Sequence, residues 1–212
     1  MQQETQFDLI VVGGGTAGAF SAIAAAREGL KVAVVERGTC LGGLAASSGL
    51  TEMNAAGFQG APLYRGIERE VFDRLIWGGH AAYHFAVPMS SNKEVKIDRL
   101  RYDPERLKLL LEQLAVEAGI TLLYETELTA AREGEEGCQI TARGPYQEIA
   151  LSGKYLIDAT GNASLVQALG GETEAADERE RMIATLMFRI SNVDLDQLDA
   201  FAQILVDYNQ KV

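Results

Sequence analysis

The sequence contains few of the residues that most often form metal centres or disulfide frameworks. Its 212 residues include only two cysteines, Cys40 and Cys138, and two histidines, His80 and His84. The two cysteines are far apart in the chain, and their spacing suits neither a zinc site nor a disulfide framework. We therefore expect no metal site, and the low cysteine content favours a reducing, cytoplasmic compartment.

Clustered positive charge and a membrane-length apolar run are also missing. The chain has 19 Lys and Arg against 30 Asp and Glu, which gives a net charge of -11. Because no basic cluster interrupts this acidity, we expect neither nucleic acid nor an anionic membrane as a partner. Residues 9–26 are mostly apolar or small, but glycines interrupt them and no Lys or Arg precedes them. We therefore expect neither a secretory signal nor a membrane span.

The first 36 residues carry the clearest structural pattern. Residues 7–12, FDLIVV, form a short run that is apolar apart from Asp8, as expected of a strand buried on both faces of a parallel sheet. Residues 17–28 are rich in small residues and good helix formers, and residues 31–36 form a second apolar run. A strand, a glycine turn, a helix and a strand within about 30 residues predict a βαβ unit.

The remaining pattern predicts an α/β fold with a Rossmann-like parallel sheet, flanking helices and a small antiparallel β meander at 121–153. Helices are expected at 63–77, at 163–169, and from an N-cap at Asp103 to Gly119. Residues 78–100 show no period and are interpreted as loop or short strands. Strands are expected at 121–128, 138–143, 147–151, 154–161 and 183–190, followed by an amphipathic stretch to Val212.

The glycines of the first turn, VVGGGTAGAF, predict a dinucleotide site. Gly13 permits a tight turn, Gly15 lets a pyrophosphate approach the backbone, and Gly18 lets the helix pack closely on the sheet. Glu36, at the end of the second strand, can accept hydrogen bonds from a ribose diol and would repel a 2′-phosphate. NADP is therefore disfavoured, while NAD and FAD both remain open at this point.

Two later stretches favour FAD. ERGTCLGGLAA places a second glycine pair after the acidic residue, and LIDATGNAS ends the next predicted buried strand. With these motifs the chain resembles FAD-dependent oxidoreductases that have a glutathione-reductase-like, two-dinucleotide-binding-domain fold. Within that class it is most similar to a bacterial family of FAD-dependent oxidoreductases, over roughly residues 6–195.

The resemblance implies a set of cofactor contacts. The pyrophosphate would meet Gly13, Gly15, Thr16 and Ala17; the adenosine would meet Glu36, Arg37 and the backbone of Leu128; the ribityl chain and flavin would lie near Gly42, Gly43 and Leu44; and Ala159, Thr160 and Gly161 would close over the nucleotide.

The sequence departs from the family in two respects. Asn162 stands where the family usually has an acid after ATG, and family members are much longer than this chain. We therefore expect an N-terminal portion that lacks most of the usual substrate domain. Residues 1–171 would be the FAD-binding domain, and 172–212 would begin a truncated substrate or cap domain.

Catalytic residues are less well indicated. His84 is a candidate for a substrate contact, although a solvated or structural role is favoured, and its spacing from His80 gives little support to a metal pair. Cys40 stands alone before the glycine pair, whereas disulfide reductases have two nearby thiols. A packing role for Cys40 is therefore favoured. Arg99 and Arg101 could reach a phosphate or an acidic substrate, or could be surface charges.

These observations predict an oxidoreductase that passes a hydride between a small organic substrate and FAD, with a separate electron acceptor. Two alternatives remain: a non-catalytic dinucleotide-binding module and an NAD-dependent oxidoreductase. A homo-oligomer is compatible with the sequence, which does not specify the oligomeric state.

Overall fold

The computed structural model describes residues 5–58, 61–88, 94–134, 137–177, 179–181 and 184–197. The chain divides into two compact units, residues 1–182 and 183–212. Both sheets lie in the first unit, and the predicted boundary between 171 and 172 also falls within it. The assignment of 172–212 to a substrate or cap domain stays a prediction.

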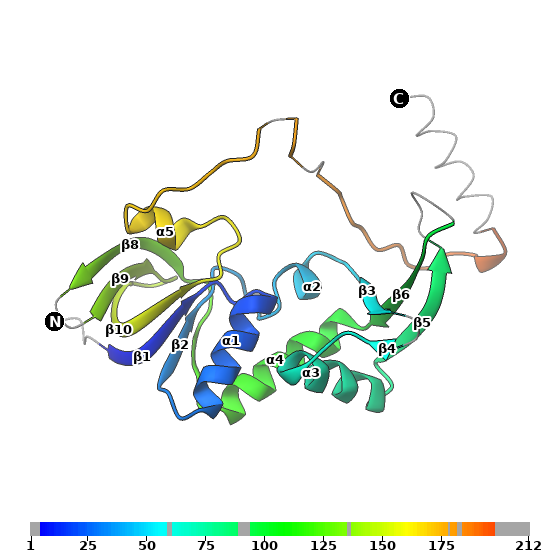
Figure 1. The fold of residues 1–212 in the computed structure, drawn as a ribbon, viewed down its shortest axis with the longest axis horizontal. Coiled ribbons are helices and arrows are strands. Elements are labelled where there is room, and N and C mark those ends of the chain that lie inside the picture. The colour runs from blue at the N-terminus through cyan, green and yellow to red at the C-terminus, as the bar shows by residue number, and fades with distance from the viewer. Residues whose placement is uncertain are drawn as a thin grey trace. The chain divides into compact units, whose positions relative to one another are not determined.

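A six-stranded sheet forms one half of the first unit (Figure 1). Its order is β7-β2-β1-β10-β9-β8, and the first four strands of that order are parallel. The strands are β1 (Thr5–Val12), β2 (Val32–Val35), β7 (Thr121–Leu123), β8 (Glu127–Gly134), β9 (Gly137–Arg143) and β10 (Glu148–Asp158). The predicted parallel sheet with an attached antiparallel meander is confirmed.

Residues 9–12 of β1 and all four residues of β2 are buried on both faces of the sheet, which explains the continuous apolar sequences there. Leu9, Val11, Val32 and Val34 pack on one face against helix α1 (Thr16–Arg27) and further helices. Alternate residues, including Ile10 and Val35, pack on the opposite face with residues of the meander and Leu165 of helix α5 (Ser164–Ala168). Because side chains alternate along a strand, burial on both sides requires apolar residues at every position.

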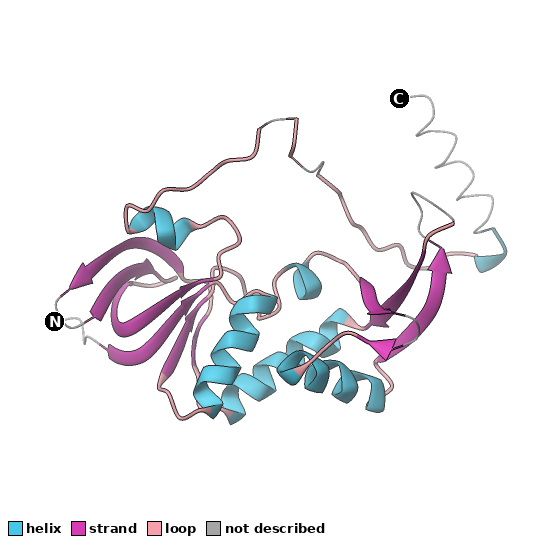
Figure 2. Ribbon diagram, viewed as in Figure 1, coloured by secondary structure: helices cyan, strands magenta, loops and turns pink. Residues whose placement is uncertain are grey.

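A second, four-stranded sheet has the order β4-β3-β6-β5. Its strands are β3 (Glu52–Phe58), β4 (Ala61–Pro62), β5 (Ala81–Pro88) and β6 (Lys96–Tyr102), and all of its pairings are antiparallel. Helices α3 (Gly66–Trp77) and α4 (Pro104–Glu117) share a core with Leu100 and Tyr102 of this sheet. Figure 2 shows the helices in cyan and both sheets in magenta.

The sheet topology corrects the predicted strand at 121–128. The strand is interrupted by a turn, because Glu125 adopts a φ of 50° and the Thr126 hydroxyl donates to the Tyr124 carbonyl at 2.8 Å. Consequently β7 belongs to the parallel strands, and the antiparallel meander begins at β8 rather than at 121. The local apolar pattern could not show that residues 121–123 pair with β2 whereas the residues from 127 onward pair with β9.

Two predicted strands, 147–151 and 154–161, are a single strand, β10. Its first half pairs with β9 and its second half with β1, so the polar residues at the junction remain within the ladder. Gly153 lies at this junction because an added Cβ would be 3.0 Å from the Ile10 side chain. The hydrogen-bonding partners on both sides therefore override the polar interruption in the sequence.

The predicted helices are present with small shifts at their ends. Helix α4 begins as expected, since Asp103 accepts a hydrogen bond from the Glu105 amide at 2.9 Å and Pro104 occupies the first turn. Helix α3 starts at Gly66 rather than at residue 63, and the Leu63 side chain is 56% exposed. The 78–100 region forms β5 and β6, which confirms the short-strand interpretation.

The second unit is described only as far as residue 197. It contains a short 3-10 helix, η1 (Leu195–Gln197). The prediction of a strand at 183–190 is wrong for its described residues, because 184–190 have no strand assignment. A strand requires a neighbouring strand to satisfy its backbone groups, and the apolar pattern alone cannot supply one. The predicted amphipathic stretch beyond 197 lies outside the described residues.

Candidate functional site

The predicted cofactor residues meet at the carboxyl ends of β1, β2 and β10, which converge where α1 begins (Figure 1). A cavity of about 630 Å³ lies there. It is lined by Val12, Gly13, Gly15, Thr16, Ala17, Glu36, Arg37, Gly43, Leu44, Ser47, Thr126, Glu127, Leu128, Ala159, Thr160, Gly161, Asn162 and Ser164. Of the predicted set, Gly18 and Gly42 are absent from this lining.

The three glycines of the predicted dinucleotide motif, two in the β1–α1 turn and one in the first turn of α1, have different roles. Gly13 has a φ of 98°, and a Cβ there would lie 2.4 Å from the Ala159 carbonyl oxygen. A Cβ on Gly18 would lie 1.9 Å from the Gly13 carbonyl oxygen. By contrast, a Cβ on Gly15 would meet no atom within 4 Å. Gly13 and Gly18 are therefore needed for packing, whereas Gly15 leaves open space in the cavity wall.

The second glycine pair packs directly against the first loop. The Gly42 amide donates to the Gly14 carbonyl at 2.8 Å, and the Thr16 hydroxyl donates to the Gly42 carbonyl at 3.2 Å. A Cβ on Gly43 would lie 2.9 Å from the Gly15 Cα. The pair thus allows two backbones to meet, and Gly42, with a φ of 100°, supports the cavity from behind rather than lining it.

Glu36 connects the same two loops through its carboxylate. One oxygen accepts from the Gly14 amide at 2.5 Å, and the other accepts from the Gly38 amide at 2.6 Å. A carboxylate has about four acceptor sites, so both oxygens retain capacity for ribose hydroxyls. Glu36 therefore fixes the loop and lines the cavity at the same time.

The turn after β10 is organised by Asp158, which sequence reasoning did not identify as a site residue. Its carboxylate accepts from the Thr160 amide at 2.9 Å, the Thr160 hydroxyl at 2.7 Å and the Val166 amide at 3.0 Å. Partial burial alone would raise the pKa of Asp158, but these hydrogen bonds outweigh it and hold the pKa below its ordinary value. The sequence signal that could have identified Asp158 is an acidic residue at the end of a predicted strand, directly before the ATG turn.

Several further lining residues were also not predicted as cofactor contacts. Each lies within three residues of a predicted residue in the sequence, so proximity in the chain was the only signal. They are Val12, Ser47, Thr126, Glu127, Asn162 and Ser164.

The weaker catalytic candidates lie elsewhere. His84 is in β5, in register with Arg99 of β6, and does not line the cavity. Arg99 and Arg101 both pair with Glu52, at 2.9 and 3.3 Å, as cross-strand ion pairs. Among the residues that the structure describes, no group of three or more His, Cys, Asp or Glu could hold a metal ion.

Cys40 lies outside the cavity lining, and both cysteines are free. Burial raises the pKa of the Cys40 thiol, with nearby carboxylates adding to the effect. Because the thiolate is the reactive form, this environment opposes nucleophilic or redox use of the sulfur.

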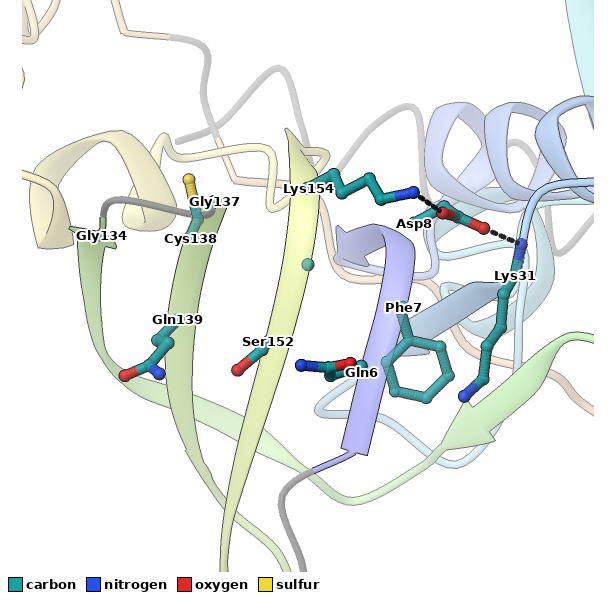
Figure 3. Close-up of a pocket in the computed structure, with 11 residues that line it drawn as sticks. Gln6, Phe7, Asp8, Lys31, Gly134, Gly137, Cys138, Gln139, Ser152 and Lys154 are labelled. Atoms are coloured by element: carbon teal, nitrogen blue, oxygen red, sulfur yellow. Dashed lines mark hydrogen bonds and ion pairs between the residues drawn. The ribbon is translucent and has the colours of Figure 1, made fainter.

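A second cavity, of about 910 Å³, lies at the opposite end of the sheet (Figure 3). It is lined by Gln6, Phe7, Asp8, Lys31, Gly134, Gly137, Cys138, Gln139, Ser152, Gly153 and Lys154. None of the predicted cofactor residues lines it. Ligands of parallel α/β sheets bind outside the carboxyl ends of the strands, so position favours the smaller cavity.

Comparison with known families agrees with this geometry. The family described as FAD dependent oxidoreductase matches residues 8–212. The chain belongs to this family. The matched range includes the glycine turn, Glu36, the second glycine pair and the ATG turn, each of which contributes residues to the cavity lining.

Solved structures show the same fold in part. The chain is 16% identical to p-nitrophenol 4-monooxygenase from Pseudomonas putida DLL-E4, with a TM-score of 0.58, over 81% of this chain and 45% of that one. It is 20% identical to OxyS anhydrotetracycline hydroxylase from Streptomyces rimosus, with a TM-score of 0.56, over 82% of this chain and 36% of that one. It is 18% identical to a 3-ketosteroid-delta4-(5alpha)-dehydrogenase from Rhodococcus jostii RHA1, with a TM-score of 0.52, over 79% of this chain and 51% of that one.

The chain therefore spans about half or less of the length of these structures. Among curated proteins, none matches this sequence. In the described part of the chain, no helix has both the length and the apolar character needed to cross a membrane.

Proposed function

We propose that this chain binds FAD in the cavity at the carboxyl ends of β1, β2 and β10, as part of an FAD-dependent oxidoreductase. The observation that carries the proposal is the coincidence of the family's glycine and acidic motifs around one cavity of about 630 Å³. This volume lies within the range of about 300–1,000 Å³ usual for small-molecule and cofactor sites.

The pyrophosphate would lie at the N-terminus of α1. The first turn of this helix contains no acidic residue, so its free amide groups and positive dipole end are not compensated by a side chain. Gly15 is the N-cap, and the open space beside it lets an anion approach the backbone closely. Thr16 and Ala17 line the same wall. These features fit a phosphate group.

The adenosine would lie on the side of Glu36 and Leu128. Glu36 has acceptor capacity for the ribose hydroxyls, Arg37 is exposed beside it, and Leu128 offers an apolar wall for the base. Gly43 and Leu44 line the cavity on the second glycine loop. The Leu44 side chain is 76% exposed, so it is free to cover the ribityl and flavin part.

Bound FAD would supply the redox chemistry by exchanging a hydride with a small organic substrate. The residues of this chain would bind and orient the cofactor: α1 holds the phosphates, Glu36 the ribose, and the turn of Ala159, Thr160 and Gly161 closes one side. Electrons would then pass to a separate acceptor. A substrate contact by His84 stays a prediction, since His84 lies outside the cavity lining.

We place the enzyme in the cytoplasm. The two free cysteines support a reducing compartment. The acidic charge of -11 supports small molecules, rather than nucleic acids, as ligands. Homo-oligomer formation is compatible with the proposal and is not required by it.

The proposal is tested by titrating the purified chain with FAD, FMN and NAD in parallel. FAD should bind most tightly, with quenched flavin fluorescence and a shifted visible absorption band. FMN should bind weakly because it lacks the adenosine and the second phosphate that the glycine loop and Glu36 would hold. Protein that binds NAD but not FAD would contradict the proposal, as would equal affinity for FAD and FMN.

A further inference from the structure

The turn that closes the cavity is held by a chain of hydrogen bonds starting at Asp158. One carboxylate oxygen accepts from both the amide and the hydroxyl of Thr160, and the other accepts from the Val166 amide. The Thr160 oxygen in turn accepts from the Ser164 amide at 3.0 Å. Asp158 therefore ties together both ends of a segment that supplies much of one cavity wall.

These bonds use the only proton of the Thr160 hydroxyl within the protein. Its single proton is donated to Asp158, and one of its lone pairs accepts from Ser164. Although Thr160 lines the cavity, its hydroxyl has no further proton to give to a phosphate or ribose oxygen. The function of this side chain is therefore to shape the turn.

The position of the turn controls the glycine loop opposite. The Ala159 amide donates to the Val12 carbonyl at 2.8 Å, and the Ala159 carbonyl fills the space where a Cβ on Gly13 would lie. A Cβ on Gly18 would also lie 3.1 Å from the Ala159 Cβ. Because these two backbone segments are in direct contact, movement of the turn would displace the loop that starts α1.

We propose that Asp158 is a positioning residue for the cofactor: through Thr160 it fixes the turn of Ala159, Thr160 and Gly161 against the glycine loop and so sets the width of the FAD cavity. This inference rests on the proposed function for its ligand. The geometry of the turn itself does not depend on the ligand, so the two can be tested separately.

The test compares Asp158→Asn with Asp8→Asn. Asp8 is a matched control because it lies on β1 at the opposite end of the sheet, where it also accepts from a backbone amide, Lys31 at 2.9 Å, and from a side chain, Lys154 at 2.7 Å (Figure 3). Asn at 158 would turn an amide donor toward the Val166 or Thr160 amide. FAD affinity should fall about tenfold or more in D158N and stay within about twofold in D8N.

Thr160 provides the second arm. Thr160→Val removes the hydroxyl but keeps the shape, and should weaken FAD binding in the same direction as D158N. Thr160→Ser keeps the hydroxyl and should restore affinity and the visible flavin spectrum to nearly those of the unmodified protein. If both D158N and T160V bind FAD within about twofold of the unmodified chain, the proposal is wrong.

Amide hydrogen exchange in the cofactor-free chain separates this inference from the proposed function. The Thr160 and Val166 amides should exchange about tenfold or more faster in D158N, while amides of α4 keep their rates. If the unmodified chain fails to bind FAD but D158N shows this local loss of protection, the proposed function fails and the organisation of the turn stands. Unchanged exchange at both amides would overturn the positioning role.

Discussion

The two ends of the six-stranded sheet differ in what lines them. At the carboxyl end, the cavity wall combines the N-terminus of α1 with glycines, small side chains and Glu36, and a Cβ on Gly13 or Gly43 would lie 2.4 Å or 2.9 Å, respectively, from another backbone. At the amino end, the wall of a larger cavity also contains glycines, but none of its lining residues begins a helix, and the exposed ion pair of Asp8 and Lys154 lies there (Figure 3). Size alone would select the amino end, away from the glycine and acidic motifs that support the proposed function.

The difference shows how a dinucleotide site is specified. Backbone amides at a helix N-terminus bind phosphate only if the chain can approach closely, which requires glycine at particular positions. At the other end, the two lysines are exposed and their contacts are with single side chains: Lys154 pairs with Asp8 at 2.7 Å, and Lys31 lies over the Phe7 ring. The N-terminus of α1 in the cavity wall, rather than cavity volume or net charge, therefore distinguishes the candidate cofactor site.

The largest expected effect comes from Gly18→Ala. The added Cβ would lie 1.9 Å from the Gly13 carbonyl oxygen, a backbone atom that cannot rotate away. We expect a loss of about 2–3 kcal/mol in the free energy of unfolding, measured by urea denaturation.

Gly15→Ala is the matched control within the same loop. Gly15 has a φ of -60° and open space around it, so the stability should change by less than about 1 kcal/mol. The new methyl group would project toward the proposed phosphate position, and FAD affinity should fall at least about tenfold. Equal losses of stability in both variants would show that the two glycines do not differ in role.

Glu36→Gln should have the next largest effect. A glutamine has only one acceptor oxygen, so one of the Gly14 and Gly38 amides would face an amide donor. We expect FAD to bind about 10- to 100-fold more weakly, as judged by fluorescence titration. Unchanged affinity would remove Glu36 from the proposed ribose site.

A smaller effect is expected for the pH dependence of stability, through Asp158 at the carboxyl end of the sheet. The hydrogen bonds lower the pKa of Asp158 in the folded protein, so its charge stabilises the fold above about pH 4. This contribution is lost as the pH falls through the lowered pKa. Urea unfolding between pH 5 and pH 3, a range set about the ordinary Asp pKa, should therefore show a shallower loss of stability in D158N than in the unmodified chain. Parallel curves would contradict this assignment.

The smallest effect is expected at the amino end. Asp8→Asn removes an exposed ion pair with Lys154, and exposed pairs contribute little to stability. FAD affinity should stay within about twofold, and the melting temperature should fall only slightly. A loss of FAD affinity comparable with that of E36Q would mean that the two ends of the sheet are coupled. It would contradict the proposal that only the carboxyl end contributes to FAD binding.

Sequence patterns predicted most of the first unit because their physical causes are local. Continuous apolar runs predicted the parallel strands, and Asp103 with Pro104 predicted the start of α4. Patterns failed where the partner strand decides the outcome. The break at Glu125 and the continuity of β10 through Gly153 depend on which strand lies alongside, and nothing in the local sequence records that.

For the candidate site, the sequence by itself determined the residue types: the glycine turn, Glu36, the second glycine pair and the ATG turn. Only the tertiary structure showed how they work together. It separated the packing glycines Gly13 and Gly18 from the open Gly15, and it brought Asp158 to the centre of the closing turn. The reason is that a motif specifies which backbone conformations are allowed, whereas clashes and hydrogen bonds between distant segments exist only after the sheet has assembled.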